Sequence, residues 1–152
     1  MFKIKKSNIN NRGLVASKNI KKNTIIVEYK GRLISKKETE TNDKFDNDKH
    51  IYLFNINKKY DLDGDYKYNT ARLINHSCDP NSEVIGKGVK LWIFSIKNIK
   101  KGEELSYDYG FSFDENYKDF ICECKSKNCC GYIIREGSRW RVNKLNHLTR
   151  KI

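Results

Sequence analysis

Apolar residues along the chain occur in short runs that mix β-branched and aromatic side chains. Three such runs cover residues 24–29, 51–56 and 91–96, and polar or glycine-bearing turns bound each of them. Runs of this length and composition predict β-strands, so we expect a mainly β protein.

Two segments depart from this strand pattern. Residues 35–48 are polar and predict a short exposed helix and a loop. Residues 139–152 space apolar side chains at helical intervals with basic residues between them, which predicts a terminal amphipathic helix built on Val142, Leu145, Leu148 and Ile152. This helix would dock on the domain, or it would contact a substrate or nucleic acid. We identify no repeat and no Pro-rich linker, so the 152 residues predict one domain.

The chain is strongly basic, with 31 Lys and Arg against 19 Asp and Glu and a formal net charge of +12. The charge is rich in Lys and scattered along the sequence. It would attract polyanions such as nucleic acid, or it would serve solubility alone, and the abundance of Lys, Asn and Ile is also typical of an AT-rich genome. Within this basic chain, three acidic residues form an acidic island: Asp61, Asp63 and Asp65. The island predicts either a solvated turn or a contact for basic residues beside a target lysine.

The five cysteines are an odd number, which argues against a complete disulfide framework. Cys122, Cys124 and Cys129 lie close together, and Cys78 could supply a fourth thiolate to a tetrahedral site. A reducing compartment with structural zinc accounts best for this spacing. Cys130 is adjacent to Cys129 and could compete with it as a ligand, but we expect Cys130 to be a spare thiol. No apolar run reaches membrane-spanning length and no secretion signal is recognisable, so we expect a soluble intracellular protein.

Two long motifs carry a family resemblance: Arg-Leu-Ile-Asn-His-Ser-Cys-Asp-Pro-Asn at 72–81 and Gly-Glu-Glu-Leu-Ser-Tyr-Asp-Tyr-Gly at 102–110. With residues 12–16 and 28–31 upstream and the cysteine segment 122–131 downstream, the chain resembles the SET-domain protein lysine methyltransferases that carry a post-SET zinc segment. The resemblance covers residues 12–131 in the family's order.

The resemblance implies the SET fold, in which several short β-sheets surround a pseudoknot and residues 107–109 thread beneath the Asn75–His76 loop. It also implies a zinc-bound post-SET tail and a short C-terminal helix. The corresponding division is a SET domain at 1–113, a post-SET zinc segment at 114–135 and a basic, helical tail at 136–152.

The family uses S-adenosylmethionine, and the resemblance assigns cofactor contacts to Arg12, Gly13, Leu14, Tyr52, Asn75 and His76. Asn11 stands where the family usually has the first glycine of its cofactor turn. Because Asn tolerates left-handed backbone conformations better than other non-glycine residues, we expect the turn to form.

The resemblance also implies an aromatic channel for the target lysine, lined by Tyr29, Phe54, Tyr107 and Tyr109. Ring faces hold the aliphatic lysine stem and tolerate a methylated ammonium. Tyr109 corresponds to the active-site tyrosine and would orient the reactants, because a tyrosine hydroxyl with an ordinary pKa of about 10 is a poor base. Tyr107 brings a second hydroxyl that narrows the channel, which predicts mainly monomethylation with some dimethylation.

The predicted function is S-adenosylmethionine-dependent methylation of a lysine in a basic protein such as a histone tail. The resemblance assigns one structural zinc ion to Cys78, Cys122, Cys124 and Cys129, which would fold the tail over the channel. The basic surface would contact nucleosomal DNA, and the nucleus or host chromatin would fit as a location. Two alternatives remain open, a methyltransferase of a non-histone protein and a catalytically silent SET module that binds protein or DNA.

Overall fold

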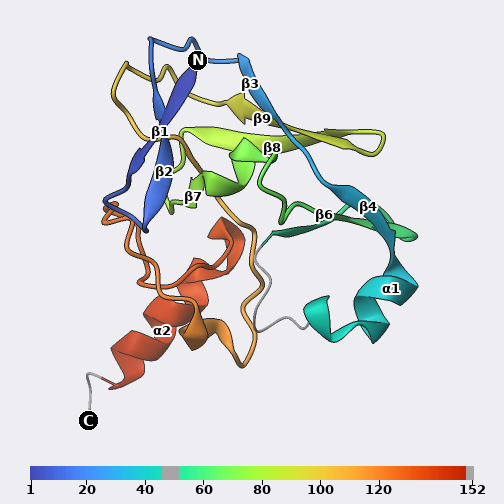
Figure 1. Cartoon of the computed structure of the whole chain (residues 1–152). Coiled ribbons are helices and arrows are strands. Elements are labelled where there is room, and N and C mark those ends of the chain that lie inside the picture. The colour runs from blue at the N-terminus through green and yellow to red at the C-terminus, as the bar shows by residue number, and fades with distance from the viewer. Residues whose placement is uncertain (46–51, 150–152) are drawn as a thin grey trace. The chain divides into compact units, whose positions relative to one another are not determined.

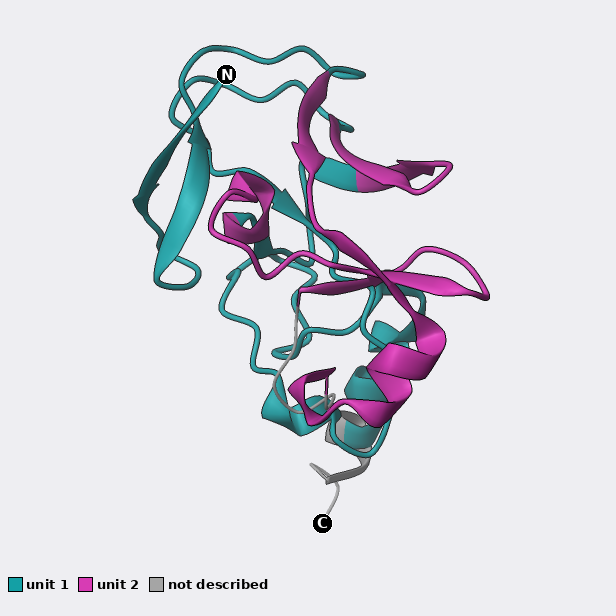
Figure 2. Cartoon of the chain, turned by 45° about the vertical axis from the view of Figure 1, so that its right-hand side comes forward, with its two compact units in different colours: residues 1–24, 74–83, 95–152 teal, residues 25–73, 84–94 magenta. Residues whose placement is uncertain are grey.

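The computed structural model describes the backbone of residues 1–45 and 52–149 and the side chains of these residues as far as residue 145. The chain forms two compact units, one of residues 1–24, 74–83 and 95–152 and the other of residues 25–73 and 84–94 (Figure 2). Each unit is therefore assembled from segments that lie far apart in the sequence. No helix in the described ranges is long and apolar enough to cross a membrane.

The first unit begins with a hairpin of β1 (Phe2–Lys6) and β2 (Arg12–Ala16), which pair antiparallel with Phe2 opposite Ala16 (Figure 1). Strand β2 supplies the core, and its Leu14 is fully buried. Farther along the chain, β7 (Asn75–His76) and β10 (Ser106–Tyr107) pair in parallel. This pairing brings the two long sequence motifs side by side, as the resemblance implied.

The C-terminal part of this unit forms two single 3₁₀ turns, η3 (Tyr117–Asp119) and η4 (Glu136–Ser138), followed by the helix α2 (Arg139–Thr149). Val142 of α2 is fully buried in a small apolar cluster with Ile134, whereas Leu145 stays exposed. The predicted terminal helix is confirmed, and Val142 docks it. The side chains of the predicted helical positions Leu148 and Ile152 lie outside the described part.

The second unit contains two three-stranded sheets. The first sheet has the order β3 (Ile25–Tyr29), β9 (Lys90–Ser95), β8 (Ser82–Lys87). Residues 82–83 of β8 and residue 95 of β9 are counted with the first unit. The second sheet has the order β4 (Arg32–Ser35), β6 (Tyr60–Asp63), β5 (Leu53–Asn55). The strands predicted at 24–29 and 91–96 are confirmed to within one residue. The strand predicted at 51–56 is observed as β5, and Ile51 lies outside the described residues.

The polar segment of the second unit forms α1 (Lys36–Thr41) and the 3₁₀ turn η1 (Asp43–Phe45), while η2 (Thr70–Leu73) ends the unit's first segment. Ser35 caps α1 because its hydroxyl accepts a hydrogen bond from the Glu38 N–H at 3.2 Å. The predicted short helix is thus confirmed, and residues 46–48 of that prediction lie outside the described part.

The acidic island of the second unit is not a solvated turn. Asp63 is fully buried and binds Lys44 Nζ at 2.7 Å, and the buried Asp61 forms an ion pair with Lys36. A buried carboxylate needs such a partner, because desolvating an unpaired charge is costly. Both expectations for the island are therefore wrong for Asp61 and Asp63, whose charges neutralise lysines of their own unit. Asp65 is exposed and lies 3.9 Å from Arg72.

Candidate active site

The side chain of Asn75 holds the turn that joins β1 to β2. Its amide nitrogen lies 3.2 Å from the carbonyl oxygens of Asn10 and Arg12, 3.0 Å from Ser7 Oγ and 2.9 Å from Glu104 Oε1. Since this nitrogen carries two hydrogens, the four acceptors share them. Asn75 is itself buried, so its amide ties the predicted cofactor turn to β7 from inside the unit.

The backbone of the turn has the conformation expected from its residues. Asn11 has a φ of +43°, which confirms that asparagine can occupy the left-handed position. A Cβ atom on Gly13 would lie 2.3 Å from Glu104 Oε1, so a larger residue at position 13 would displace this carboxylate from the Asn75 amide. Leu14 continues the strand and accepts the Leu105 N–H at its carbonyl oxygen, at 2.7 Å.

Glu104 was not among the residues expected in the site. Its carboxylate accepts the Ser7 hydroxyl at 2.7 Å and the Asn75 amide at 2.9 Å. The only signal in the sequence was its place in the second long motif, where nothing distinguished it from its neighbour Glu103.

His76 connects the predicted active-site tyrosine to the cysteines. Its Nδ1 accepts the Tyr109 N–H at 3.1 Å, and its Nε2 lies 3.6 Å from Cys78 Sγ. Burial lowers the pKa of His76 to about 4, with the positive charge of Arg139 adding to the effect and Asp108 opposing it. The imidazole is thus neutral near pH 7, and because Nδ1 is an acceptor its proton resides on Nε2, facing the sulfur.

Tyr107 and Tyr109 form an aromatic pair in the first unit, with ring centroids 4.9 Å apart. The Tyr109 hydroxyl donates to the Ile74 carbonyl oxygen at 2.9 Å, and the ring of His76 meets the Tyr109 ring edge-on at 5.4 Å. The Tyr107 side chain is buried. Both tyrosines are therefore held beside the Asn75–His76 strand, as the resemblance required.

Arg139, at the start of α2, is a buried arginine with three acceptors. Its guanidinium donates to Asp108 Oδ2 at 2.6 Å, to the Cys78 carbonyl oxygen at 2.7 Å and to the Ile134 carbonyl oxygen at 2.9 Å. Asp108 lies between the two tyrosines in the sequence. The sequence did not indicate this ion pair. Arg139 is one of several basic residues in the terminal segment and Asp108 is one acidic residue within a motif, so neither identifies the other as its partner.

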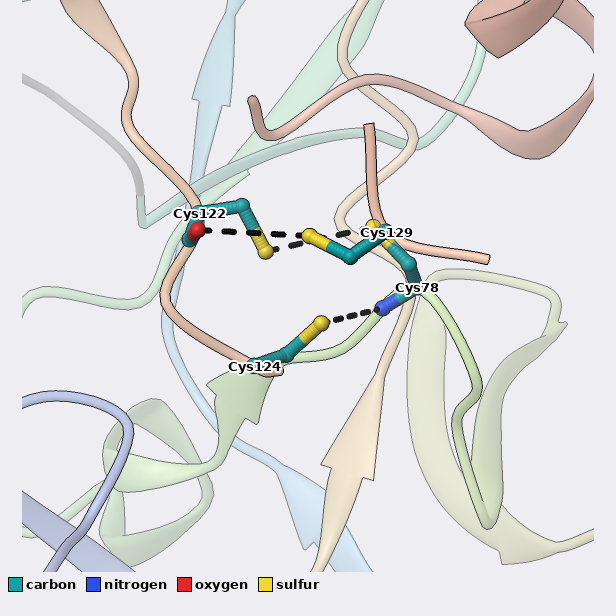
Figure 3. Close-up of side chains that lie close together, drawn as sticks. All are labelled: Cys78, Cys122, Cys124 and Cys129. Carbon is teal, nitrogen blue, oxygen red and sulfur yellow. Dashed lines mark hydrogen bonds between the residues drawn. The ribbon is translucent and has the colours of Figure 1, made fainter. Parts of the chain in front are cut away.

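The four predicted zinc ligands converge, as Figure 3 shows, from the loop after β7 and from the tail. The sulfur atoms of Cys78, Cys122, Cys124 and Cys129 all lie within 4.8 Å of one another, and those of Cys78 and Cys122 are 3.9 Å apart. Tetrahedral zinc with bonds of about 2.3 Å separates its sulfur ligands by about 3.8 Å, so the cluster fits the ion.

Two of these sulfur atoms accept backbone hydrogen bonds, although burial raises the pKa of Cys129 to about 11. The Cys78 N–H donates to Cys124 Sγ and the Gly131 N–H donates to Cys129 Sγ, each at 3.4 Å. Burial alone would raise the pKa of Cys124, but hydrogen bonds from Ser126 and the Cys78 N–H outweigh it and lower the pKa to about 6. The hydrogen bond with Cys122, together with burial, raises the pKa of Cys78, so a bound cation would be needed to ionise all four.

Cys130 lies outside this group. Its buried thiol packs in the apolar cluster of Ile134 and Val142 and donates to the Tyr132 carbonyl oxygen at 3.4 Å. Four sulfur donors leave no ligand position for water, which is the pattern of a structural rather than a catalytic zinc site.

The other predicted channel and cofactor residues lie in the second unit. The Tyr29 ring is almost wholly buried and meets the Phe54 ring edge-on at 4.7 Å, while its hydroxyl donates to the Tyr52 carbonyl oxygen at 3.2 Å. A Cβ atom on Gly64 would lie 2.2 Å from the Tyr29 ring, so this packing requires glycine. Tyr29, Tyr52 and Phe54 are thus brought together within their own unit.

Comparison with known proteins shows which protein family the chain is similar to. The family model described as SET domain matches residues 11–110. The chain is 38% identical over 130 residues to Histone-lysine N-methyltransferase 2D of Homo sapiens, and 37% identical over 134 residues to Histone-lysine N-methyltransferase trithorax of Drosophila virilis. It is 32% identical over 148 residues to Variant-silencing SET domain-containing protein of Plasmodium falciparum. These matches cover 82%, 84% and 90% of the chain but only 2%, 3% and 6% of the respective relatives.

Proposed function

The chain belongs to the SET-domain family, and on this premise we propose that it is an S-adenosylmethionine-dependent protein-lysine N-methyltransferase that acts on a histone. The observation that carries the proposal is the parallel pairing of β7 with β10, which joins Asn75 and His76 to the Tyr107–Tyr109 pair. Two of the relatives above are histone-lysine N-methyltransferases, which supports the substrate class.

We assign the cofactor to the turn that Asn75 and Glu104 hold, and we propose as its contacts the residues that the resemblance assigned: Arg12, Gly13, Leu14, Tyr52, Asn75 and His76. Bound S-adenosylmethionine supplies an electrophilic methyl group. The chain's own contribution is a preformed turn, because the Asn75 amide donates to the carbonyl oxygens of Asn10 and Arg12 and to the Glu104 carboxylate, which holds the amide in place. A preformed site avoids the cost of ordering a loop when the ligand arrives.

Tyr109 would orient the reacting amine rather than remove its proton. Its hydroxyl hydrogen is engaged by the Ile74 carbonyl oxygen, so the oxygen offers lone pairs as acceptors. His76 is no alternative base, because Nδ1 is occupied by the Tyr109 N–H and Nε2 faces Cys78. The proton of the target lysine therefore leaves to solvent, and alignment of the reactants supplies most of the rate enhancement.

The second hydroxyl, on Tyr107, sets the degree of methylation in this proposal, with monomethyl-lysine as the main product and some dimethyl-lysine. Together with Tyr109, Tyr29 and Phe54 it would form the aromatic lining of the lysine channel. The Tyr107→Phe variant should shift the product toward di- and trimethyl-lysine in mass spectrometry of a methylated peptide. A product distribution identical to that of the wild type would contradict this role of Tyr107.

The four-cysteine cluster is proposed to hold one structural zinc ion, with residues 114–135 as the zinc segment between a SET domain at 1–113 and the tail at 136–152. The ion would tie the tail to the loop that follows His76, through Cys78. Its place in the reaction is indirect, since an all-sulfur site offers no open position to a substrate.

The test of the activity is transfer of labelled methyl groups to nucleosomes, histone octamers and a panel of histone-tail peptides, with Tyr109→Phe as the matched inactive control. Label in a histone that disappears in the control supports the proposal, and a nuclear or host-chromatin location would then follow. Label that appears only in other proteins favours a non-histone substrate. Binding of S-adenosylmethionine by calorimetry without any transfer would identify a catalytically silent module instead.

A further inference from the structure

The pentapeptide Lys-Asn-Ile-Lys-Lys occurs twice in the chain, at residues 18–22 and 97–101. The expectation that the chain contains no repeat is therefore wrong at this short length. Both copies belong to the first unit. The repeat becomes meaningful only through the way in which the two copies pair.

The copies pair antiparallel about their central isoleucines. The Ile20 N–H donates to the Ile99 carbonyl oxygen and the Ile99 N–H donates to the Ile20 carbonyl oxygen, each at 2.8 Å. Both isoleucine side chains are buried. Each copy is followed by a residue in the left-handed region, Asn23 with a φ of +65° and Gly102 with a φ of +95°.

The asparagines of the two copies exchange equivalent hydrogen bonds. Asn98 Oδ1 accepts the Lys22 N–H, and Asn19 Oδ1 accepts the Lys101 N–H, each at 2.8 Å. Each side chain thus stabilises the turn of the other copy. A set of contacts that repeats when the copies are exchanged defines a local two-fold axis between them.

The flanking backbone extends the same symmetry. The Ala16 N–H donates to the Glu103 carbonyl oxygen at 2.9 Å, and at the equivalent place the Ser95 N–H donates to the Thr24 carbonyl oxygen at 2.9 Å. The two-fold relation therefore includes residues 16–24 and 95–103. Symmetric bonding on both sides fixes where the lysines of each copy emerge.

The lysines form three pairs related by this axis, and all six are exposed: Lys18 with Lys97, Lys21 with Lys100, and Lys22 with Lys101. We call these six residues the lysine cluster. Lys97 forms an ion pair with Asp79, in which both side chains are exposed, and such pairs contribute little. Within the described ranges no ion pair engages the other five. Residues 1–24 contain seven Lys and Arg and no acidic residue, so no carboxylate within this segment offsets their positive charge.

We propose that the lysine cluster binds the two phosphate backbones of double-stranded DNA, with one copy of the pentapeptide facing each strand. The antiparallel strands of a duplex are related by two-fold axes perpendicular to the helix, so a two-fold set of cations presents the same groups to both. The cluster contains neither arginine nor an aromatic ring. Phosphate contacts from lysine position a protein without reading bases, so we expect binding that is independent of sequence. An anionic lipid surface would accept the same charge but imposes no such symmetry.

The binding test needs neither cofactor nor activity. Fluorescence anisotropy is measured with a labelled duplex of about 20 base pairs as the salt concentration rises. If each of the six lysines neutralises one phosphate, the logarithm of affinity falls against the logarithm of salt with a slope near −5, so affinity drops about 10³-fold between about 50 and 200 mM salt. The test variant replaces four lysines of the cluster: Lys21→Gln, Lys22→Gln, Lys100→Gln and Lys101→Gln.

This variant should weaken binding by at least tenfold at low salt and reduce the slope to about −2, because two phosphate contacts remain. A control variant loses the same net charge from exposed lysines of the second unit: Lys58→Gln, Lys59→Gln, Lys67→Gln and Lys87→Gln. The control should keep the wild-type slope. Equal losses of duplex affinity in both variants would show that binding depends on net charge alone, and would overturn the proposal.

The symmetry has its own test. The half variants Lys21→Gln/Lys22→Gln and Lys100→Gln/Lys101→Gln should weaken duplex binding equally, to within about twofold, and single-stranded DNA should bind less tightly than the duplex. Unequal halves, equal binding of single strands, or a loss confined to phosphatidylserine vesicles would each contradict the proposal.

The consequence for methylation rests on the proposed function, because nucleosomal DNA would then hold the enzyme beside its histone substrate. The four-lysine variant should retain methylation of a free histone-tail peptide and lose most methylation of nucleosomes. Absence of methylation on every substrate, with duplex binding intact, would refute the proposed function and leave the DNA site standing.

Discussion

Replacing Arg139 by methionine should destabilise the protein and reduce the proposed catalysis, because this arginine joins α2 to the segment between Tyr107 and Tyr109. The guanidinium is 7% exposed and Asp108 is 23% exposed. Methionine fills a similar volume but removes all three hydrogen bonds, to Asp108, to the Cys78 carbonyl and to the Ile134 carbonyl.

The expected cost follows from what each partner loses. Breaking a buried ion pair costs about 3–5 kcal/mol, and the lower end applies because Asp108 is partly exposed and still accepts the N–H groups of Gly110 and Glu136. The Ile134 carbonyl loses a buried donor, which adds about 1 kcal/mol. The Cys78 carbonyl keeps the Asn128 amide. The sum is about 4 kcal/mol, a large part of the roughly 5–15 kcal/mol that stabilises a typical domain.

Urea unfolding followed by tryptophan fluorescence measures this cost, and a thermal melt should show a decrease of about 8–16 °C. Arg139→Lys keeps the charge but cannot reach three divergent acceptors, so it should lose about half as much stability and allow kinetics on folded protein. Its kcat should fall more than its KM rises, because Asp108 adjoins Tyr107 and Tyr109. A free-energy loss below about 1 kcal/mol in Arg139→Met would refute the reasoning, since the pair would then contribute no more than an exposed one.

Three further predictions concern the metal, the cofactor turn and a glycine. Removal of zinc by a strong chelator, or the variant Cys124→Ser, should lower the melting temperature and abolish methyl transfer. The control variant Cys130→Ser should retain its zinc, as measured by elemental analysis. Full activity of the metal-free protein would contradict the structural role of the ion. Glu104→Gln keeps the shape of the side chain but weakens its hydrogen bond with the Ser7 hydroxyl. We expect the KM for S-adenosylmethionine to rise about tenfold, which corresponds to about 1.4 kcal/mol. An unchanged KM with reduced stability alone would show that the cofactor turn does not depend on this carboxylate. Gly64→Ala should cost about 1–3 kcal/mol in urea unfolding because the new methyl group meets the Tyr29 ring, and wild-type stability would show that the ring yields freely.

Local features of the fold were accessible from the sequence because they depend on neighbouring residues. Runs of β-branched and aromatic residues predicted the strands that became β3 and β9, and the polar segment after Ile34 predicted α1. The left-handed turn at Asn11 followed from the chemistry of one side chain. Cysteine spacing indicated three clustered thiols and Cys78 as a possible fourth, and the family resemblance then assigned all four as zinc ligands.

Long-range pairings were not accessible in this way. The charge pattern identified the acidic residues Asp61 and Asp63 but not the lysines that form ion pairs with them. These lysines lie 25 and 19 positions away in the sequence, with no periodic relation to the acidic residues. The same holds for Arg139 and Asp108, which are 31 positions apart. A charged residue shows its sign in the sequence, whereas its burial depends on what the backbone brings to it.

The family motifs, the four candidate zinc ligands and the repeated Lys-Asn-Ile-Lys-Lys segments can be read directly from the amino-acid sequence. That the Asn75 amide and the Glu104 carboxylate hold one turn, and that the two pentapeptides pair about a two-fold axis, is seen only in the folded chain. Composition and spacing specify which groups are available, while the parallel pairing of β7 with β10 and the antiparallel pairing at Ile20 and Ile99 specify which groups meet.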